Sequence, residues 1–112
     1  MDLGKDLVAA SATPLVLAIL AEGESYGYAI IKRVSGLSGG HLNWTDGMLY
    51  PVLHRLERNG LVAAKWGSSE SGRRRKYYRL TREGRTHLEA ERKRWRIADE
   101  TLGRLWMKAC PA

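Results

Sequence analysis

Residues 45–59 constrain the fold most, because their apolar side chains recur with the period of an α-helix. At about 100° per residue, one stripe comprises Leu49, Val52, Leu53 and Leu56. The opposite side comprises Gly47, Pro51, His54 and Arg58, flanked by Tyr50 and Arg55. Thr45 is the expected N-cap, and Asn59-Gly60 is the expected end, because glycine accepts the left-handed conformation common there. We therefore expect a helix with one face in the core and the other free for a partner.

Two more helices are predicted before this one. The apolar block 15–20 follows Thr13-Pro14, so a helix either begins there, capped by Thr13, or already runs from Asp2 with a kink near Pro14. Ser25 offers an N-cap for a second helix, and Gly27 within its apolar pattern suggests close packing. The glycines of 36–40 then mark a turn.

A basic β-hairpin is predicted after the third helix. Residues 61–66 form the first expected strand, 67–72 a polar turn, and 73–80 the returning strand. The second strand begins with the unbroken cationic run Arg73, Arg74, Arg75 and Lys76. Side chains alternate along a strand, so only about half of these cations can face one partner. Tyr77 and Tyr78 are expected to divide, one packing inward and one facing solvent or phosphate.

A long final helix, capped by Thr81, carries apolar residues at heptad spacing. This expected interface between two copies comprises Leu88, Trp95, Ala98, Leu102, Leu105 and Trp106. Glu91 and Arg92 interrupt the seam, so its C-terminal half is the stronger candidate for a packed interface.

Three helices, a hairpin and a long helix predict a mainly α fold with a small β-hairpin, that is, a winged helix-turn-helix plus a C-terminal helix. Residues 1–80 form the expected DNA-binding domain and 81–112 the dimerisation helix, packed as one compact unit. The first thirty residues lack a signal-peptide pattern and no run suits a membrane span, so a cytoplasmic protein is expected. The lone Cys110 suits a reducing compartment and has no companion ligands, so neither metal nor cofactor is expected.

The charge balance favours a polyanionic partner. Nineteen Lys and Arg against twelve Asp and Glu give a net charge of +7. A solvated basic face is the alternative until the fold is considered, and double-stranded DNA fits the fold because the third helix enters the major groove. The expected DNA-binding residues are Thr45, Gly47, Tyr50, Pro51, His54, Arg55, Arg58, Arg73, Arg74, Arg75, Lys76 and Tyr78. For His54, base contact and simple solvation are equally favoured.

Four segments, residues 26–28, 46–51, 54–62 and 72–78, resemble PadR-like regulators in order and spacing. The single C-terminal helix is similar to the short subtype of that family. The resemblance implies a homodimeric repressor on a pseudo-palindromic site, released by phenolic or planar aromatic molecules. It also implies an effector site at Trp66, Trp95 and Ala98, where tryptophan can stack on a flat ligand. The alternative for a tryptophan at heptad spacing is ordinary interface core.

Three other classes of function are disfavoured. No nucleophile, base and stabiliser come together in the local sequence, so an enzyme is not expected. A winged-helix protein-interaction module without DNA binding would normally carry an acidic or apolar row on the third helix, whereas this row is polar and basic. RNA binding would call for an aromatic platform that the third helix lacks.

Overall fold

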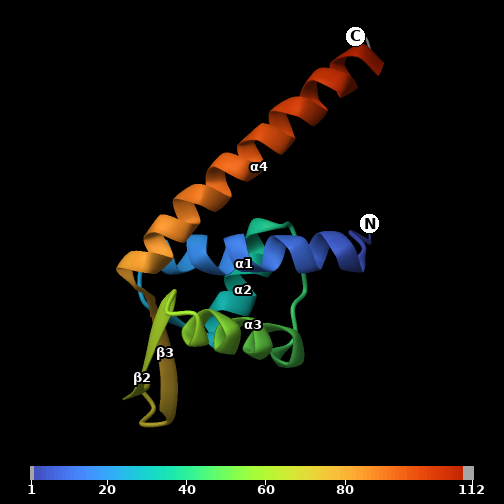
Figure 1. The fold of residues 1–112 in the computed structure, drawn as a ribbon. Coiled ribbons are helices and arrows are strands. Elements are labelled where there is room, and N and C mark those ends of the chain that lie inside the picture. The colour runs from blue at the N-terminus through green and yellow to red at the C-terminus, as the bar shows by residue number, and fades with distance from the viewer. Residues whose placement is uncertain (1, 110–112) are drawn as a thin grey trace.

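The computed structural model describes residues 2–109, and Cys110 lies outside them. In chain order the elements are α1 (Lys5–Ala21), β1 (Ser25–Tyr26), α2 (Gly27–Leu37), α3 (Asp46–Arg58), β2 (Val62–Ser68), β3 (Arg74–Leu80) and α4 (Arg82–Ala109). Figure 1 shows α1 lying between α4 on one side and α2 and α3 on the other, while most of α4 extends away from the body. The predicted winged helix-turn-helix with a long C-terminal helix is confirmed.

Helix α1 runs through Pro14, so the prediction of a start at Thr13 is wrong. The alternative of a helix that already runs before Pro14 is correct, but the helix starts at Lys5 and not at Asp2. Proline removes one helical hydrogen bond, but apolar side chains on both sides of it pack into the core, and this burial outweighs the loss. The buried residues of α1 are Ala12, Val16, Leu17, Ile19 and Leu20.

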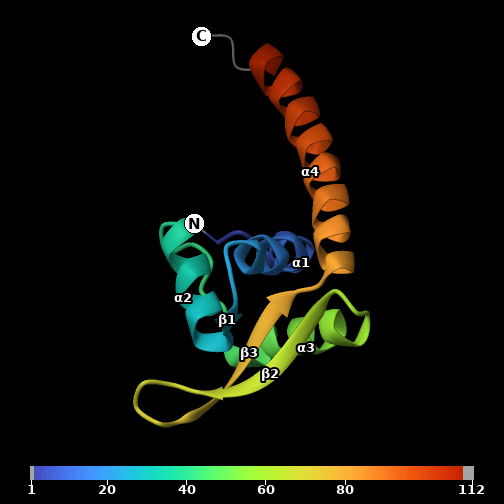
Figure 2. The same ribbon diagram turned by 90° about the vertical axis from the view of Figure 1, so that its left-hand side faces the viewer.

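Ser25 does not cap α2, contrary to the prediction, because Ser25 and Tyr26 form a short strand instead. Ser25 lies opposite Tyr78 and Tyr26 opposite Tyr77, so the hairpin becomes a three-stranded antiparallel sheet in the order β1-β3-β2. Helix α2 then starts at Gly27, with Tyr26 as an N-cap whose side chain makes no capping hydrogen bond. The start of α2 is thereby fixed beside the hairpin, as Figure 2 shows.

The ends of α3 and the hairpin follow the local sequence closely. The Thr45 hydroxyl accepts a hydrogen bond from the Met48 amide at 3.3 Å, and Gly60 adopts a φ of 75° just after the helix. The first strand continues to Ser68, two residues beyond the predicted Trp66. The predicted cap at the start of α4 is confirmed, since the Thr81 hydroxyl accepts from the Gly84 amide at 3.0 Å. We call the hairpin of residues 62–80 the wing.

The core lies among α1, α2, α3 and the sheet, and it includes Leu88 from the start of α4. Leu88 is only 8% exposed within its own chain, so its predicted place in an interface between copies is wrong. The remaining seam residues, Trp95, Ala98, Leu102, Leu105 and Trp106, are exposed. Within residues 2–109, no helix is both long and apolar enough to cross a membrane.

Candidate nucleic-acid interface

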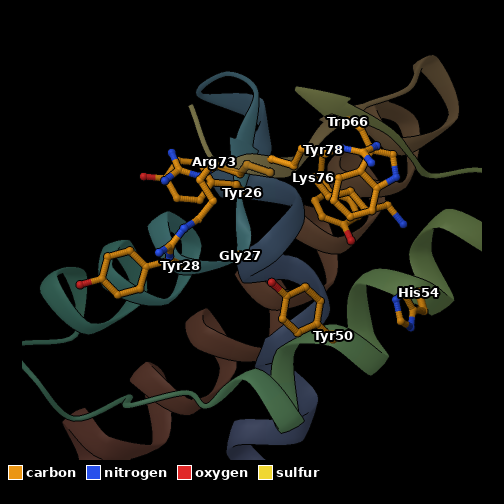
Figure 3. Close-up of a pocket in the computed structure, with 11 residues that line it drawn as sticks. Tyr26, Gly27, Tyr28, Tyr50, His54, Trp66, Arg73, Lys76 and Tyr78 are labelled. Atoms are coloured by element: carbon orange, nitrogen blue, oxygen red, sulfur yellow. The ribbon is translucent and has the colours of Figure 1, made fainter. Parts of the chain in front are cut away.

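A cavity of about 770 Å³ opens between the wing, the start of α2 and the outer face of α3, and we call it the wing cleft. It is lined by Tyr26, Gly27, Tyr28, Tyr50, His54, Trp66, Arg73, Arg74, Arg75, Lys76 and Tyr78. No carboxylate is among these lining residues. Figure 3 shows aromatic and basic side chains gathered around this cleft from all three elements. The cleft therefore combines positive charge with aromatic surface, which suits a polyanion.

The cations of the wing rest on aromatic rings. The guanidinium of Arg74 lies 4.9 Å from the ring centre of Trp66, and that of Arg75 lies 3.8 Å from the ring centre of Tyr26. Such cation–π contacts restrain long, flexible side chains. The sheet register explains one of them, because Ser68 lies opposite Arg74 and Trp66 opposite Lys76, which places Trp66 and Arg74 on the same face. The wing thus presents guanidinium groups in restrained positions.

An ion pair joins the wing to α3. The Lys76 ammonium lies 3.5 Å from a Glu57 carboxylate oxygen, and it also lies 5.5 Å from the ring centre of Tyr78. Lys76 is consequently partly neutralised, whereas Arg73, Arg74 and Arg75 form no ion pair within residues 2–109. Sequence reasoning singled out Lys76 but not Glu57. A charged residue at position 57 does not disturb the apolar period of α3, so the local sequence gives no sign of this ion pair.

Tyr78 is a core residue, contrary to the exposed position that its predicted DNA contact requires. Its side chain is 1% exposed, and among residues 2–109 its hydroxyl has no hydrogen-bond partner. Burial raises the pKa of Tyr78 to about 12, with smaller contributions from the negative charge of Glu57 and from Tyr50. Tyr77, on the other face of β3, is half-buried, and its ring packs edge-on against that of Tyr26 with the ring centres 5.7 Å apart. One tyrosine, Tyr78, packs inward as predicted. The other, Tyr77, is half-buried and does not fully face solvent.

The outward face of α3 presents its predicted side chains to solvent, although two of them have local partners. His54, Pro51 and Arg58 are exposed. Arg55 donates a hydrogen bond of 2.9 Å to the Thr13 hydroxyl and so leans toward α1. Thr45 caps the helix through its hydroxyl, so that oxygen already has a role within the protein.

Gly47 and Tyr50 complete this face. Gly47 is exposed, which leaves room for close approach at the start of α3. The Tyr50 ring is 37% exposed, and its centre lies 6.3 Å from that of His54. The structure therefore brings Tyr50 and His54 to the same cleft as the cations.

The two tryptophans of the predicted effector site do not share a cavity within the chain. Trp66 is 61% exposed and lines the wing cleft, so within one described chain it does not lie beside Trp95. Trp95 lines a second, apolar groove of about 380 Å³ between α1 and α4. Ala98 shares a shallower hollow with Trp95 and Ala10. The indole N–H of Trp95 donates to Glu91 at 3.1 Å.

Sequence reasoning also missed the contribution of β1 and the start of α2 to the cleft. Tyr26, Gly27 and Tyr28 line it, and the only hint was that they form one of the four family-like segments. Among the described residues, no three His, Cys, Asp or Glu side chains are grouped so that they could hold a metal ion.

Known proteins share this arrangement of helices and wing. The family described as "Transcriptional regulator PadR-like family" matches residues 16–90. The chain belongs to the PadR-like family. This family consists of transcriptional regulators and not of enzymes, and its winged helix is a DNA-binding fold. The protein is thus a DNA-binding transcriptional regulator.

Individual PadR-like and related regulators are similar over most of the chain. The transcriptional regulator YqjI of Escherichia coli (strain K12) is 30% identical over 88 residues, which cover 79% of this chain and 41% of that protein. The chain thus matches less than half of the length of YqjI. A transcriptional regulator from Clostridium thermocellum superposes with a TM-score of 0.81 at 28% identity, covering 91% of this chain and 96% of the other. A PadR family regulator from Clostridium difficile R20291 gives a TM-score of 0.75 at 31% identity, covering 86% and 98%.

Proposed function

We propose that the protein is a homodimeric repressor that binds a pseudo-palindromic duplex, with α3 in the major groove and the wing on the phosphate backbone. The observation that carries this proposal is the wing cleft, where four consecutive cations and the exposed face of α3 border one cavity without a lining carboxylate. Guanidinium groups bind phosphate oxygens in pairs, while the polar groups on α3 suit base edges. The proposed contacts are Gly47, Tyr50, Pro51, His54, Arg55, Arg58, Arg73, Arg74, Arg75 and Lys76, with Thr45 at the helix start.

The test is a selection of bound fragments from random duplex DNA with the purified full chain. We expect an enriched motif with two inverted half-sites, their centres about one helical turn of 34–36 Å apart or a multiple of it. A chain that carries Arg74→Ala and Arg75→Ala is the control and should recover far less DNA under the same conditions. Recovery of no motif by the wild-type chain would favour the alternative of a winged-helix module that binds a protein.

The dimer is proposed to form through the C-terminal part of α4, so that residues 1–80 bind DNA and residues 81–112 join two copies. Leu102, Leu105 and Trp106 support this, because they are 44%, 59% and 59% exposed on a helix that has no neighbour there among residues 2–109. Exposed apolar side chains at heptad spacing are typical of a helix that packs against another helix. One winged helix contacts only a few base pairs, so two copies are needed for useful specificity.

An effector of planar aromatic or phenolic chemistry is proposed to bind near Trp95 and Ala98 and to release the repressor from DNA. The apolar groove beside Trp95 supports this, because its volume of about 380 Å³ falls in the range of small-molecule sites. Stacking and burial can supply micromolar affinity, about −8 kcal/mol. The two copies can be spaced so that they bind DNA or so that they do not. A ligand that binds the second arrangement more tightly lowers DNA affinity by the ratio of its affinities for the two arrangements.

The effector proposal is tested by titrating cationic dyes and phenolic acids while tryptophan emission is recorded. We expect quenching in the wild-type chain and in Trp66→Phe, and none in Trp95→Ala. Equal binding by wild type and Trp95→Ala would place the site elsewhere, and no binding by either would leave Trp95 as interface core.

A further inference from the structure

The backbone conformation of residue 27 does not require a glycine. Gly27 begins α2, and it is not among the residues with positive φ in the described chain. Alanine is favoured over glycine in helices, so a glycine there lowers helix stability unless it is needed for another purpose. Gly27 is also buried, which indicates that a neighbour occupies the space of its missing side chain.

That neighbour is Tyr50 of α3. A Cβ atom on residue 27 would lie 2.6 Å from the Tyr50 hydroxyl oxygen, too close for a real contact, and 3.0 Å from the ring carbon that bears it, tighter than most contacts. Figure 3 shows the Tyr50 hydroxyl directed toward Gly27, across the gap between the two helices. The Tyr50 hydroxyl therefore occupies space that is free only because residue 27 has no side chain.

We propose that Gly27 is a positioning residue for DNA recognition, because it holds Tyr50 at the edge of the wing cleft. This inference rests on the proposed function, in which Tyr50 contacts DNA. A side chain that is already restrained loses less conformational entropy when it binds than one that rotates freely. Tyr50 belongs to α3 and packs against Gly27 of α2, so both helices set its position.

A substitution at residue 27 should displace Tyr50 without unfolding the chain. The clash involves the free end of a side chain that is 37% exposed, so the ring can swing into solvent. Gly27→Ala should therefore keep its cooperative thermal transition, since better helix propensity offsets the lost contact. Its defect should appear in DNA binding alone.

The test is a double-mutant cycle on a selected duplex with wild type, Gly27→Ala, Tyr50→Ala and the double variant. We expect each single variant to lose about tenfold in affinity and the double variant to lose no more than Tyr50→Ala, as for residues that act through one contact. The matched control is Gly36→Ala, because Gly36 is also in α2, has no positive φ and has nothing within 4 Å of its would-be Cβ. Gly36→Ala should bind DNA like the wild type.

A structural readout without DNA separates this inference from the proposed function. In 3-fluorotyrosine-labelled protein, the ¹⁹F resonance of Tyr50 is assigned by its loss in Tyr50→Phe. It should shift in Gly27→Ala and stay in place in Gly36→Ala. An unshifted resonance with wild-type affinity in Gly27→Ala would overturn the inference and leave the proposed function intact. Additive losses in the double variant would also overturn it, whereas wild-type affinity in Tyr50→Ala would remove the DNA contact on which it rests.

Discussion

The ammonium group of Lys76 lies 3.5 Å from the carboxylate of Glu57, so an ion pair joins the wing to α3 at the proposed DNA surface. Glu57→Gln keeps the shape of the side chain but removes a negative charge that opposes phosphate. We expect affinity for duplex DNA to rise by about threefold to tenfold at low salt, and the log–log salt slope to steepen by up to about one. Fluorescence anisotropy over a series of salt concentrations measures both.

Glu89→Gln is the control for this prediction, since Glu89 is exposed on α4 and pairs with Arg92. It should leave DNA affinity nearly unchanged. The melting temperature of Glu57→Gln should also change little, because an ion pair this exposed adds little stability. Weaker DNA binding by Glu57→Gln would contradict this prediction. It would mean that Glu57 helps Lys76 to reach phosphate and does not oppose that contact.

The second prediction concerns the arginines of the wing. If two copies neutralise about six phosphates, the logarithm of the affinity should fall with log salt at a slope near −5. Arg74→Ala with Arg75→Ala should weaken binding to all duplexes alike and flatten this slope, whereas His54→Ala or Arg58→Ala should act mainly on the preferred sequence. Unchanged affinity in the double variant would show that the wing does not bind the backbone.

The third prediction assigns Trp66 to DNA binding through Arg74. Because the Trp66 ring restrains the Arg74 guanidinium at 4.9 Å, Trp66→Ala should lower DNA affinity about as much as Arg74→Ala. The combined variant should lose no more than either one alone, and Trp66→Phe should retain most of the affinity. Electrophoretic mobility shifts measure all four proteins. Wild-type affinity in Trp66→Ala would contradict this role.

The fourth prediction concerns the buried hydroxyl of Tyr78. Burial holds its pKa at about 12, above the ordinary value of 10.0, so the folded chain keeps a proton that the unfolded chain releases. The contribution to stability is complete below pH 10 and is lost as the pH rises from about 10 to 12, by up to about 3 kcal/mol. Denaturant unfolding across this pH range measures the loss.

Tyr78→Phe should abolish that part of the alkaline loss. It should also stabilise the chain at neutral pH by about 1 kcal/mol, because it removes a buried hydroxyl that has no partner among residues 2–109. DNA affinity should not change, in keeping with a core position. Tyr28→Phe, at a side chain that is 62% exposed, is the control for stability. A loss of DNA binding in Tyr78→Phe would restore Tyr78 to the interface.

The fifth prediction tests the proposed dimer. Leu102→Asp would bury an unpaired charge between two copies of α4, which costs several kcal/mol. We expect sedimentation velocity to show a monomer with much weaker DNA binding, while Thr101→Asp, one residue off the seam, remains dimeric. An unchanged dimer in Leu102→Asp would move the interface elsewhere.

Helix α3, which carries the proposed contacts, was the most predictable element. Its N-cap at Thr45, its buried stripe around Leu53 and its end before Gly60 are three local signals that indicate the same helix. The start of α1 was not predictable from local rules, since Pro14 lies in the middle of a buried helix. Strand β1 has two residues, too few for any period, and it exists because Ser25 and Tyr26 pair with a strand some fifty residues later.

In the candidate site, local sequence located the cations but not their neighbours. Alternation requires Tyr77 and Tyr78 to face opposite ways, yet only the register with β1 and β2 decides which one is buried. Heptad spacing likewise does not distinguish the core of one chain from an interface between two, so Leu88 was misplaced. Nothing near Trp66 in the sequence shows on which side of the wing it lies, so its place in the wing cleft was not predictable either.

Helix α4 has 28 residues in a chain whose longest dimension is 56 Å. At about 1.5 Å per residue it is about 42 Å long, so a tilt of about 10° at one end moves the other by about 7 Å. That displacement equals about two base-pair steps of 3.4 Å each. Where two copies pair through the far ends of this helix, it works as a lever arm. In the proposed dimer, a tilt of about 10° at the crossing point would therefore shift each α3 helix by about two base-pair steps along the duplex.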